Sequence, residues 1–260
     1  MSRAEFFRGR LLKIVVPYLI SVAVYFIYMY ARGWVGFGGM PEYIFLGTLA
    51  AHFYYIIIAV QLYLLFPILK LIFDRYPMDL ALIALASTVI FNQFIRFNYS
   101  DRFFGTYIFY FVLGMLFARY KPHLKWRAFR IVSVILALGV GATHITVFYL
   151  AELRQEWYIY AGIVNVIYYT LAISALISIF SLIANRLERV YKCASVLDSA
   201  SYEIYLYHIL IMLNIERGLT PLLGLSLKWQ FVISFAILYG ASIGYAILKY
   251  RLPKRKKTAK

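Results

Sequence analysis

The chain has 260 residues, of which 63% are hydrophobic and only 15% are charged, and its formal net charge is +16. A typical soluble domain is about 45–50% apolar and about 25% charged, and so much apolar surface cannot be buried inside a soluble protein of this size. The composition therefore excludes a soluble or a disordered chain and predicts an integral membrane protein.

Eight apolar runs have, or come close to, the length of about 17–25 residues that a membrane-crossing helix needs. They are Ile14–Ala31, Phe53–Phe73, Leu80–Ile95, Phe103–Ala118, Ile131–Leu150, Trp157–Ala184, Ser201–Ile215 and Trp229–Leu248. We therefore expect an all-α polytopic transmembrane helical bundle of about eight spans, forming a single domain over residues 1–260.

The basic residues predict the orientation of this bundle. With the N-terminus inside, 21 of the 27 Lys and Arg residues fall in the inner stretches, as the positive-inside rule requires. Both termini are then cytoplasmic, and residues 249–260 form a basic tail that lies against anionic lipid head groups. Because this orientation explains the positive charge, we expect membrane lipids and no nucleic acid among the partners.

Polar residues at membrane depth are costly and are therefore candidates for function. The candidates within spans are Gln61, Asn92, His144, Asn165 and His208, while His52 opens the second span at the predicted outer surface. Each can also be read as a residue that bonds neighbouring helices together. We expect no metal site, because Cys193 is the single cysteine and the four histidines are scattered.

His208 lies in a polar notch of an otherwise apolar helix. Ser201, Tyr205 and His208 are spaced by four and three residues, so they share one helical face. A buried histidine needs a hydrogen-bond partner, which we expect on a neighbouring helix. The histidine then either lines a reaction cavity or locks the bundle together.

Three stretches, taken together, carry a resemblance. They are FFRGRLLKIVVPYL at Phe6–Leu19, HFYYIIIAVQLYLLFPIL at His52–Leu69 and SYEIYLYH at Ser201–His208, with a weaker match in YFVLGMLFARY at Tyr110–Tyr120. Their order and spacing resemble acyltransferase family 3, the multi-helix membrane acyltransferases of bacteria.

The resemblance implies transfer of an acyl group from cytoplasmic acyl-CoA to a hydroxyl of a cell-envelope glycan, by a multi-pass protein of the inner (plasma) membrane. Guanidinium and ammonium groups suit phosphate, and a histidine can serve as general base. The implied roles are catalytic for His208 and His52, CoA-binding for Arg8, Arg10 and Lys13, and substrate-cavity lining for Gln61, Tyr63, Ser201 and Tyr205.

The sequence also departs from the family pattern. The family has about ten spans, with its usual catalytic histidine in the first, and this chain begins where the third span should begin. We therefore expect the chain to lack the first two family helices, and to need them for acyl transfer. A bundle without that hairpin would expose polar helix faces, which favours a homo-oligomer.

Two other interpretations remain open. A transporter or export component for a lipid-linked glycan needs the same polar-lined bundle without a catalytic histidine. A non-catalytic membrane scaffold needs neither a polar-lined bundle nor a catalytic histidine.

Overall fold

The computed structural model describes residues 3–95, 97–120, 127–154, 161–186, 188–215, 217, 224 and 226–251. Its described part is helical and contains no strand, in agreement with the predicted all-α class. The helices in chain order are α1 (Arg3–Tyr30), α2 (Met40–Phe45), α3 (Tyr54–Arg75), α4 (Pro77–Gln93), α5 (Ile108–Tyr120), α6 (Arg127–Arg154), α7 (Ala161–Arg186), α8 (Glu188–Asn214) and α10 (Leu227–Arg251). The short 3-10 turns between them are η1 (Phe37–Gly39), η2 (Ala51–Phe53), η3 (Ser100–Arg102) and η4 (Phe104–Thr106).

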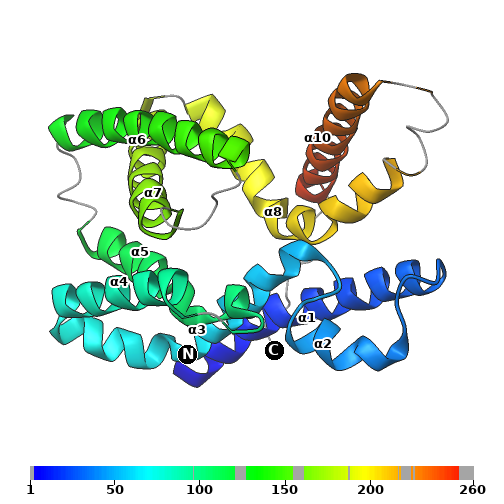
Figure 1. The fold of residues 1–260 in the computed structure, drawn as a ribbon, viewed down its shortest axis with the longest axis horizontal. Helices are drawn as coiled ribbons and strands as arrows, with labels where there is room; N and C mark the ends of the chain where they lie inside the picture. Colours follow the sequence, from blue (N-terminus) through cyan, green and yellow to red (C-terminus); the bar gives the residue numbers. More distant parts are fainter. Residues whose placement is uncertain are drawn as a thin grey trace. The chain divides into compact units, whose positions relative to one another are not determined.

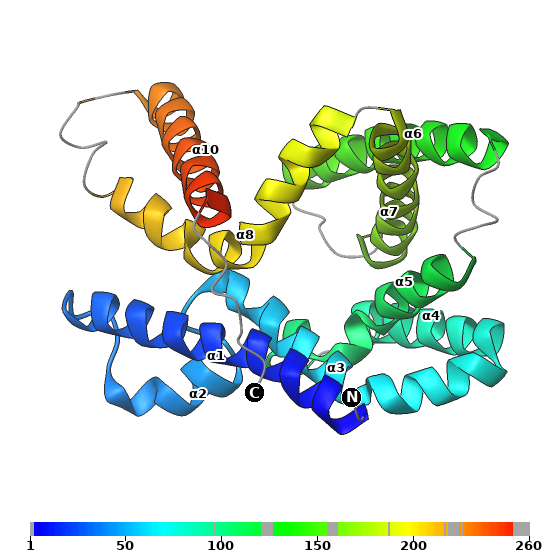
Figure 2. The ribbon, with the colours of Figure 1, turned by 180° about the vertical axis from the view of Figure 1, so that it is seen from behind.

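The chain folds into two compact units (Figures 1 and 2). The terminal unit combines Met1–Phe53 with Leu187–Lys260, so it joins the two ends of the sequence. The central unit is the continuous segment Tyr54–Arg186.

In the terminal unit, tyrosine hydroxyls connect α1 to α8. Tyr202 of α8 donates to the carbonyl of Ile14 at 2.7 Å, and Tyr28 of α1 donates to Oδ1 of Asn214 at 3.0 Å. The contacts advance along both helices together, so α1 and α8 run in the same direction. The predicted topology requires this of its first and seventh spans, while the side on which the termini lie stays a prediction.

The core of the terminal unit is largely aromatic. Tyr25 and Phe53 are both fully buried, and their ring centroids lie 5.1 Å apart in an edge contact. Tyr18 packs edge-on against Phe53 at 5.3 Å and donates its hydroxyl to the carbonyl of Ile44 at 2.9 Å. Offset and edge-to-face ring pairs of this kind add to the energy of burial, and here they fix η2 and α2 against α1.

The core of the central unit lies between α3, α4, α5 and α7. Its buried residues are Leu69, Phe73, Leu80, Ala81, Ala84, Phe109, Val112 and Val166. Ala84 is 1% exposed, and such a small residue lets the helix backbones approach closely. Thr88 is also buried, and its hydroxyl accepts the backbone N–H of Phe109 at 3.2 Å, which seats the start of α5 on α4.

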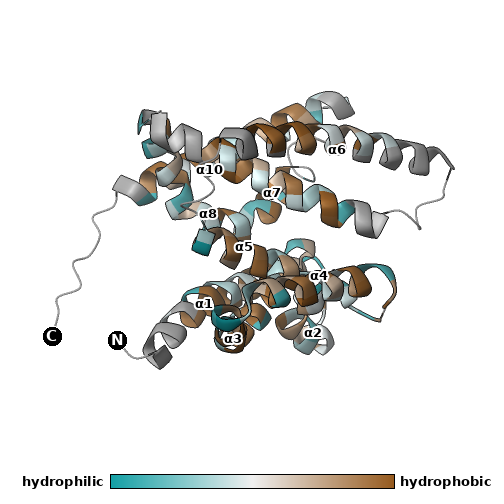
Figure 3. Ribbon diagram, turned by 90° about the vertical axis from the view of Figure 1, so that its left-hand side faces the viewer, coloured by the Kyte–Doolittle hydropathy of each residue, from teal (hydrophilic) through white to brown (hydrophobic). Residues whose placement is uncertain are grey.

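Three helical segments of the described chain are long and apolar enough to cross a membrane: Leu11–Tyr30, Ala51–Arg75 and Trp229–Lys249. Shorter apolar helices cover Pro77–Gln93, Ile108–Tyr120, Val134–Thr143 and Asn165–Phe180. These seven segments overlap seven of the eight predicted spans. The predicted span that they do not overlap, Ser201–Ile215, lies almost entirely in α8, which carries hydrophilic stretches (Figure 3). The number of spans therefore stays a prediction.

The basic N-terminal stretch is helical. Helix α1 continues without interruption from Arg3 to Tyr30, and Pro17 lies inside it rather than at its start. A proline within a helix removes one backbone hydrogen bond.

Candidate functional site

The terminal unit brings together the two histidines that the sequence analysis named as catalytic. The ring centroids of His52, in η2, and His208, in α8, lie 4.9 Å apart. From the sequence we placed His52 at the outer surface and His208 inside its span. Two rings in contact must lie at the same depth, so that difference in depth was wrong. The pairing arises because η2 packs against the middle of α8, which no local sequence pattern reveals.

Backbone carbonyls set the proton positions on both rings. Nδ1 of His208 lies 2.7 Å from the carbonyl of Tyr205, and Nε2 of His52 lies 3.2 Å from the carbonyl of Leu206. A carbonyl oxygen only accepts, so both of these ring nitrogens donate. In the neutral rings the lone pairs are then on Nε2 of His208 and on Nδ1 of His52.

The two lone pairs differ in their surroundings. Nδ1 of His52 is buried and has no hydrogen-bond partner. His208 is partly exposed, and its Nδ1–H bond holds the ring while Nε2 remains available as a base. We expected the hydrogen-bond partner of His208 on a neighbouring helix, but its Nδ1 bonds a carbonyl of its own helix. Its contact with His52 is a contact of rings. The geometry therefore favours His208 as the base and His52 as the residue that orients it.

Tyr25 of α1 bonds the backbone of α8 beside the histidine pair. The Tyr25 hydroxyl accepts the backbone N–H of Leu210 at 2.9 Å and donates to the carbonyl of Leu206 at 3.1 Å. An uninterrupted α-helix pairs these two backbone groups with each other, so the hydroxyl lies within the hydrogen-bond ladder on either side of His208. Side chains inserted in this way bend helices, and Figures 1 and 2 show that α8 bends along its length.

Of the other two cluster residues proposed on α8, one contacts His52 and one does not. The Tyr205 hydroxyl donates to the carbonyl of His52, and the two rings lie 5.2 Å apart, so Tyr205 fastens η2 to α8. Ser201 is exposed, and its hydroxyl donates to the carbonyl of Asp198 at 2.8 Å. Such a local bond is common for serine in a helix. Ser201 therefore has no described contact with the histidines.

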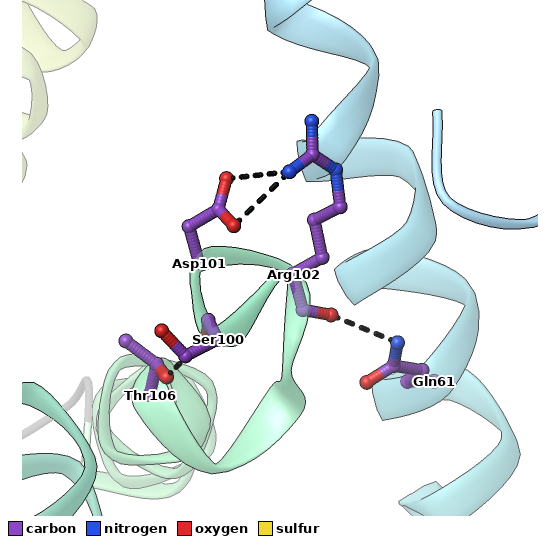
Figure 4. A network of polar contacts seen from close by, with 5 residues as sticks. All are labelled: Gln61, Ser100, Asp101, Arg102 and Thr106. Atoms are coloured by element: carbon purple, nitrogen blue, oxygen red, sulfur yellow. Dashed lines mark hydrogen bonds and ion pairs between the residues drawn. The ribbon is translucent and has the colours of Figure 1, made fainter. Parts of the chain in front are cut away.

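Gln61, proposed as a cavity residue, clamps a loop of the central unit. Its amide nitrogen donates to the carbonyl of Arg102 at 2.9 Å (Figure 4). Its amide oxygen accepts the N–H of Phe104 at 2.9 Å. Within the same loop, the Thr106 hydroxyl donates to the carbonyl of Ser100 at 3.0 Å. Both ends of the Gln61 amide are thus occupied by backbone groups, and the residue fixes the chain that leads into α5.

Tyr63 lines a cavity of about 390 Å³ in the central unit. The cavity wall also includes Tyr54, Tyr55, Tyr107 and Tyr110. Tyr63 is therefore the proposed cavity residue for which the structure shows an actual cavity, although this cavity belongs to a different unit from the histidine pair.

The proposed CoA-binding residues all belong to α1. The side chains of Arg8 and Arg10 lie outside the described part of the structure. Lys13 is exposed on α1.

Among the polar residues predicted within spans, Asn92 bonds backbone groups. Its amide donates to the carbonyls of Thr88 at 2.7 Å and Thr106 at 3.1 Å. Asn92 therefore bonds neighbouring segments together, which was the alternative interpretation of the polar residues in spans.

The sequence analysis missed Tyr25. Its buried hydroxyl touches two backbone groups of α8, but tyrosine is one of the commonest residues of this chain, with 25 copies. No spacing or motif marks Tyr25 among them. Within the described residues, no group of three or more His, Cys, Asp or Glu side chains could hold a metal ion.

Comparison with known proteins identifies the class of this chain. A family model described as an acyltransferase domain, that of acyltransferase family 3, matches residues 1–251. The chain therefore belongs to acyltransferase family 3, a family of membrane acyltransferases, as the three sequence stretches suggested. No curated protein and no solved structure matches it.

Proposed function

We propose that this protein transfers an acyl group from acyl-CoA to a hydroxyl of a cell-envelope glycan, with His208 as the general base. The observation that carries the proposal is the ring contact between His52 and His208 in a chain of an acyltransferase family. The setting is the inner membrane, where a cytoplasmic donor and an external acceptor are both within reach of a bundle.

The reaction needs a group that removes a proton from the acceptor hydroxyl. Nε2 of His208 takes that proton as the oxygen attacks the thioester carbonyl, and the carbon–sulfur bond then breaks. The proton passes to the departing thiolate, so the products are an O-acyl glycan and free CoA. A positioned base of this kind contributes about 10²–10⁴-fold to a rate.

His52 and Tyr205 support this base rather than replace it. His52 holds the Leu206 carbonyl through Nε2, and Tyr205 holds the His52 carbonyl through its hydroxyl. The ring of His208 is thereby confined between η2 and its own helix turn. A rigid base that is already oriented avoids the entropy loss of orienting it during the reaction.

The donor is proposed to enter beside the N-terminal part of α1. Arg8, Arg10 and Lys13 supply three positive charges within six residues, and arginine binds phosphate oxygens in a bidentate manner. Lys13 is exposed, so its ammonium group is accessible to a phosphate. The exposed cation supports this part of the proposal, which remains independent of the histidine pair.

The test is complementation of a strain that lacks the gene. The acyl content of its envelope glycan is measured with the wild-type protein, His208→Gln and His52→Gln, and protein abundance in the membrane is measured beside it. Tyr28→Phe, which alters a peripheral bond of the same unit, is the matched control.

The proposal expects acylated glycan with the wild type and with Tyr28→Phe, and loss of acylation with His208→Gln at normal abundance. His52→Gln should lower acylation less than His208→Gln, since it disturbs only the orientation of the base. Full acylation with His208→Gln, or no acylation with the wild-type protein, would overturn the proposal.

A further inference from the structure

Two arginines of the terminal unit converge on one tryptophan just beyond the ends of α1 and α8. The guanidinium carbon of Arg217 lies 4.1 Å from the ring centroid of Trp34, and that of Arg32 lies 5.6 Å from the ring centroid of the same residue. Both distances are within the range of cation–π contacts. The convergence arises because α1 and α8 run in the same direction, so that the segments that follow them meet. We call these three residues the arginine–tryptophan cluster.

The cluster holds two positive charges close together. The two distances to Trp34 place the guanidinium carbons no more than about 10 Å apart, which is close to the Debye length of about 8 Å at physiological ionic strength. Like charges at this spacing repel each other. None of the ion pairs among the described residues includes Arg32 or Arg217. An anion bound at the cluster would therefore relieve the repulsion.

The donors of the cluster are accessible. Arg32 and Arg217 are both exposed, and Trp34 is 41% exposed. Nη1 of Arg32 donates to the carbonyl of Tyr28 at 3.2 Å, which holds this side chain against the C-terminal end of α1. A guanidinium group carries several N–H donors, and this bond uses one of them. The planar group matches the oxygen geometry of a phosphate.

The length of α1 places the cluster at a membrane surface. A helix of 28 residues is about 42 Å long, which exceeds the hydrocarbon thickness of about 30 Å. The basic N-terminal part of α1 and the cluster therefore lie at opposite surfaces. Tryptophan and tyrosine are enriched at the level of the lipid head groups, which is also the level of lipid phosphates.

The positive-inside rule does not account for the pair of arginines. The predicted topology puts this end of α1 outside, where only six of the 27 Lys and Arg residues fall. Arg32 and Arg217 are two of these six, and they meet at one side chain although 185 positions separate them. Basic residues that set topology act from the cytoplasmic side. The pair therefore calls for an anion at the outer surface.

Exposed apolar side chains accompany the cluster. Ile27 and Tyr30 of α1 and Phe37 of η1 are all exposed, and the rings of Tyr30 and Phe37 are in contact at 5.1 Å. The N–H of Gly33 donates to the carbonyl of Tyr30 at 2.9 Å, so the turn that carries the cluster follows directly on these residues. A soluble anion would leave this apolar surface uncovered, whereas a lipid covers it with its acyl chains.

We infer that the arginine–tryptophan cluster binds the phosphate of an anionic phospholipid at the surface opposite to the N-terminal end of α1. The two guanidinium groups donate to the phosphate oxygens, and Trp34 keeps both groups in place. The exposed apolar residues beside the cluster contact the acyl chains. This inference goes beyond the proposed acyl transfer and does not depend on it.

The experiment measures lipid binding to the full chain, purified in detergent and delipidated. Native mass spectrometry follows the titration with phosphatidylglycerol and, separately, with phosphatidylcholine. Arg32→Gln and Arg217→Gln each remove one charge of the cluster. Arg75→Gln is the matched control, because Arg75 is exposed and lies 5.5 Å from the ring centroid of Tyr76 but belongs to the central unit. Thermal unfolding of each variant shows that the fold is kept.

Phosphatidylglycerol should bind more tightly than phosphatidylcholine. Arg32→Gln and Arg217→Gln should each weaken binding of phosphatidylglycerol by about tenfold or more, the size expected for a charged hydrogen bond, while Arg75→Gln has little effect. Equal weakening by Arg75→Gln and by the two cluster variants, or equal binding of the two lipids by the wild type, would overturn the inference.

Two variants that keep the charge distinguish a built site from general attraction. Trp34→Leu removes the ring that both guanidinium groups contact, and Arg32→Lys removes the planar fork of donors. Each should weaken binding of phosphatidylglycerol measurably, and binding unchanged in both would overturn the inference.

Soluble competitors test the source of the anion. Glycerol 3-phosphate carries the phosphate without acyl chains, and galacturonate represents an acidic sugar. Neither should displace phosphatidylglycerol at equal concentration. Displacement by glycerol 3-phosphate would show a site for soluble phosphates, displacement by galacturonate would show a site for an acidic glycan, and either result would overturn the assignment to a lipid.

Discussion

Replacing Tyr25 with phenylalanine removes one hydroxyl and keeps the buried ring. The hydroxyl lies between the N–H of Leu210 and the carbonyl of Leu206, at 2.9 and 3.1 Å, and Tyr25 is fully buried. The carbonyl of Leu206 keeps His52 as a donor at 3.2 Å. The variant therefore leaves one backbone group, the N–H of Leu210, without its acceptor.

This one unsatisfied N–H determines the expected loss in the free energy of unfolding. An unsatisfied buried N–H costs about 1–3 kcal/mol, and the ring packing against Phe53 is unchanged. We expect Tyr25→Phe to lower the free energy of unfolding by about 1–3 kcal/mol. If α8 closes its own ladder instead, the cost falls toward the lower limit, the bend in α8 relaxes, and the His208 ring moves relative to His52.

Two assays together test the role of the Tyr25 hydroxyl. Thermal unfolding in nanodiscs gives the stability, and hydrogen–deuterium exchange reports on the N–H of Leu210. The control is Tyr28→Phe, whose hydroxyl bonds the exposed Asn214; a surface change of this kind costs about 0.5 kcal/mol or less. Unchanged stability together with unchanged exchange at Leu210 would refute the idea that the Tyr25 hydroxyl is part of the α8 ladder.

Three further predictions follow from the structure and the sequence. Gln61→Leu removes both bonds of the loop clamp, and we expect it to lower the free energy of unfolding by about 1–3 kcal/mol in thermal unfolding; a loss no greater than that of an exposed substitution would contradict the clamp. Arg10→Ala should weaken binding of acyl-CoA by about 10-fold or more, the size expected of a charged hydrogen bond, and Arg10→Lys should weaken it too if the contact is bidentate; equal binding by wild type and both variants would leave Arg10 as a membrane anchor. Reporter fusions at Gly38 and Lys260 should read outside and inside respectively, and an outside reading at Lys260 would refute the predicted topology.

The sequence predicted the all-α membrane fold because composition and run length are sufficient for it. It also named His52, His208 and Tyr205, since polar groups in apolar runs are conspicuous. It did not predict that the two histidines touch. That contact depends on η2 packing against α8, more than 150 residues away along the chain, and no periodicity encodes such a long-range pairing.

Two other features show where sequence reasoning fails. Gln61 was predicted to line a substrate cavity, but a glutamine amide can bond a ligand or a backbone loop, and only the position of Arg102 and Phe104 shows which backbone groups it meets. Eight of the nine residues around the cavity that Tyr63 lines belong to α3 or α5, which are separate in sequence. Their convergence depends on helix packing around Ala84 and Val112 rather than on any local pattern.

Transfer of a radiolabelled acyl group shows whether His208 acts as the base. Inverted membrane vesicles containing the protein receive labelled acyl-CoA, and the label in the glycan fraction is counted for wild type, His208→Gln and Tyr28→Phe. We expect His208→Gln to lower the rate by about 100-fold or more at equal protein abundance, while Tyr28→Phe keeps the wild-type rate. A His208→Gln rate within about twofold of the wild-type rate would contradict the role of His208 as base, because the loss of a general base lowers a rate much more.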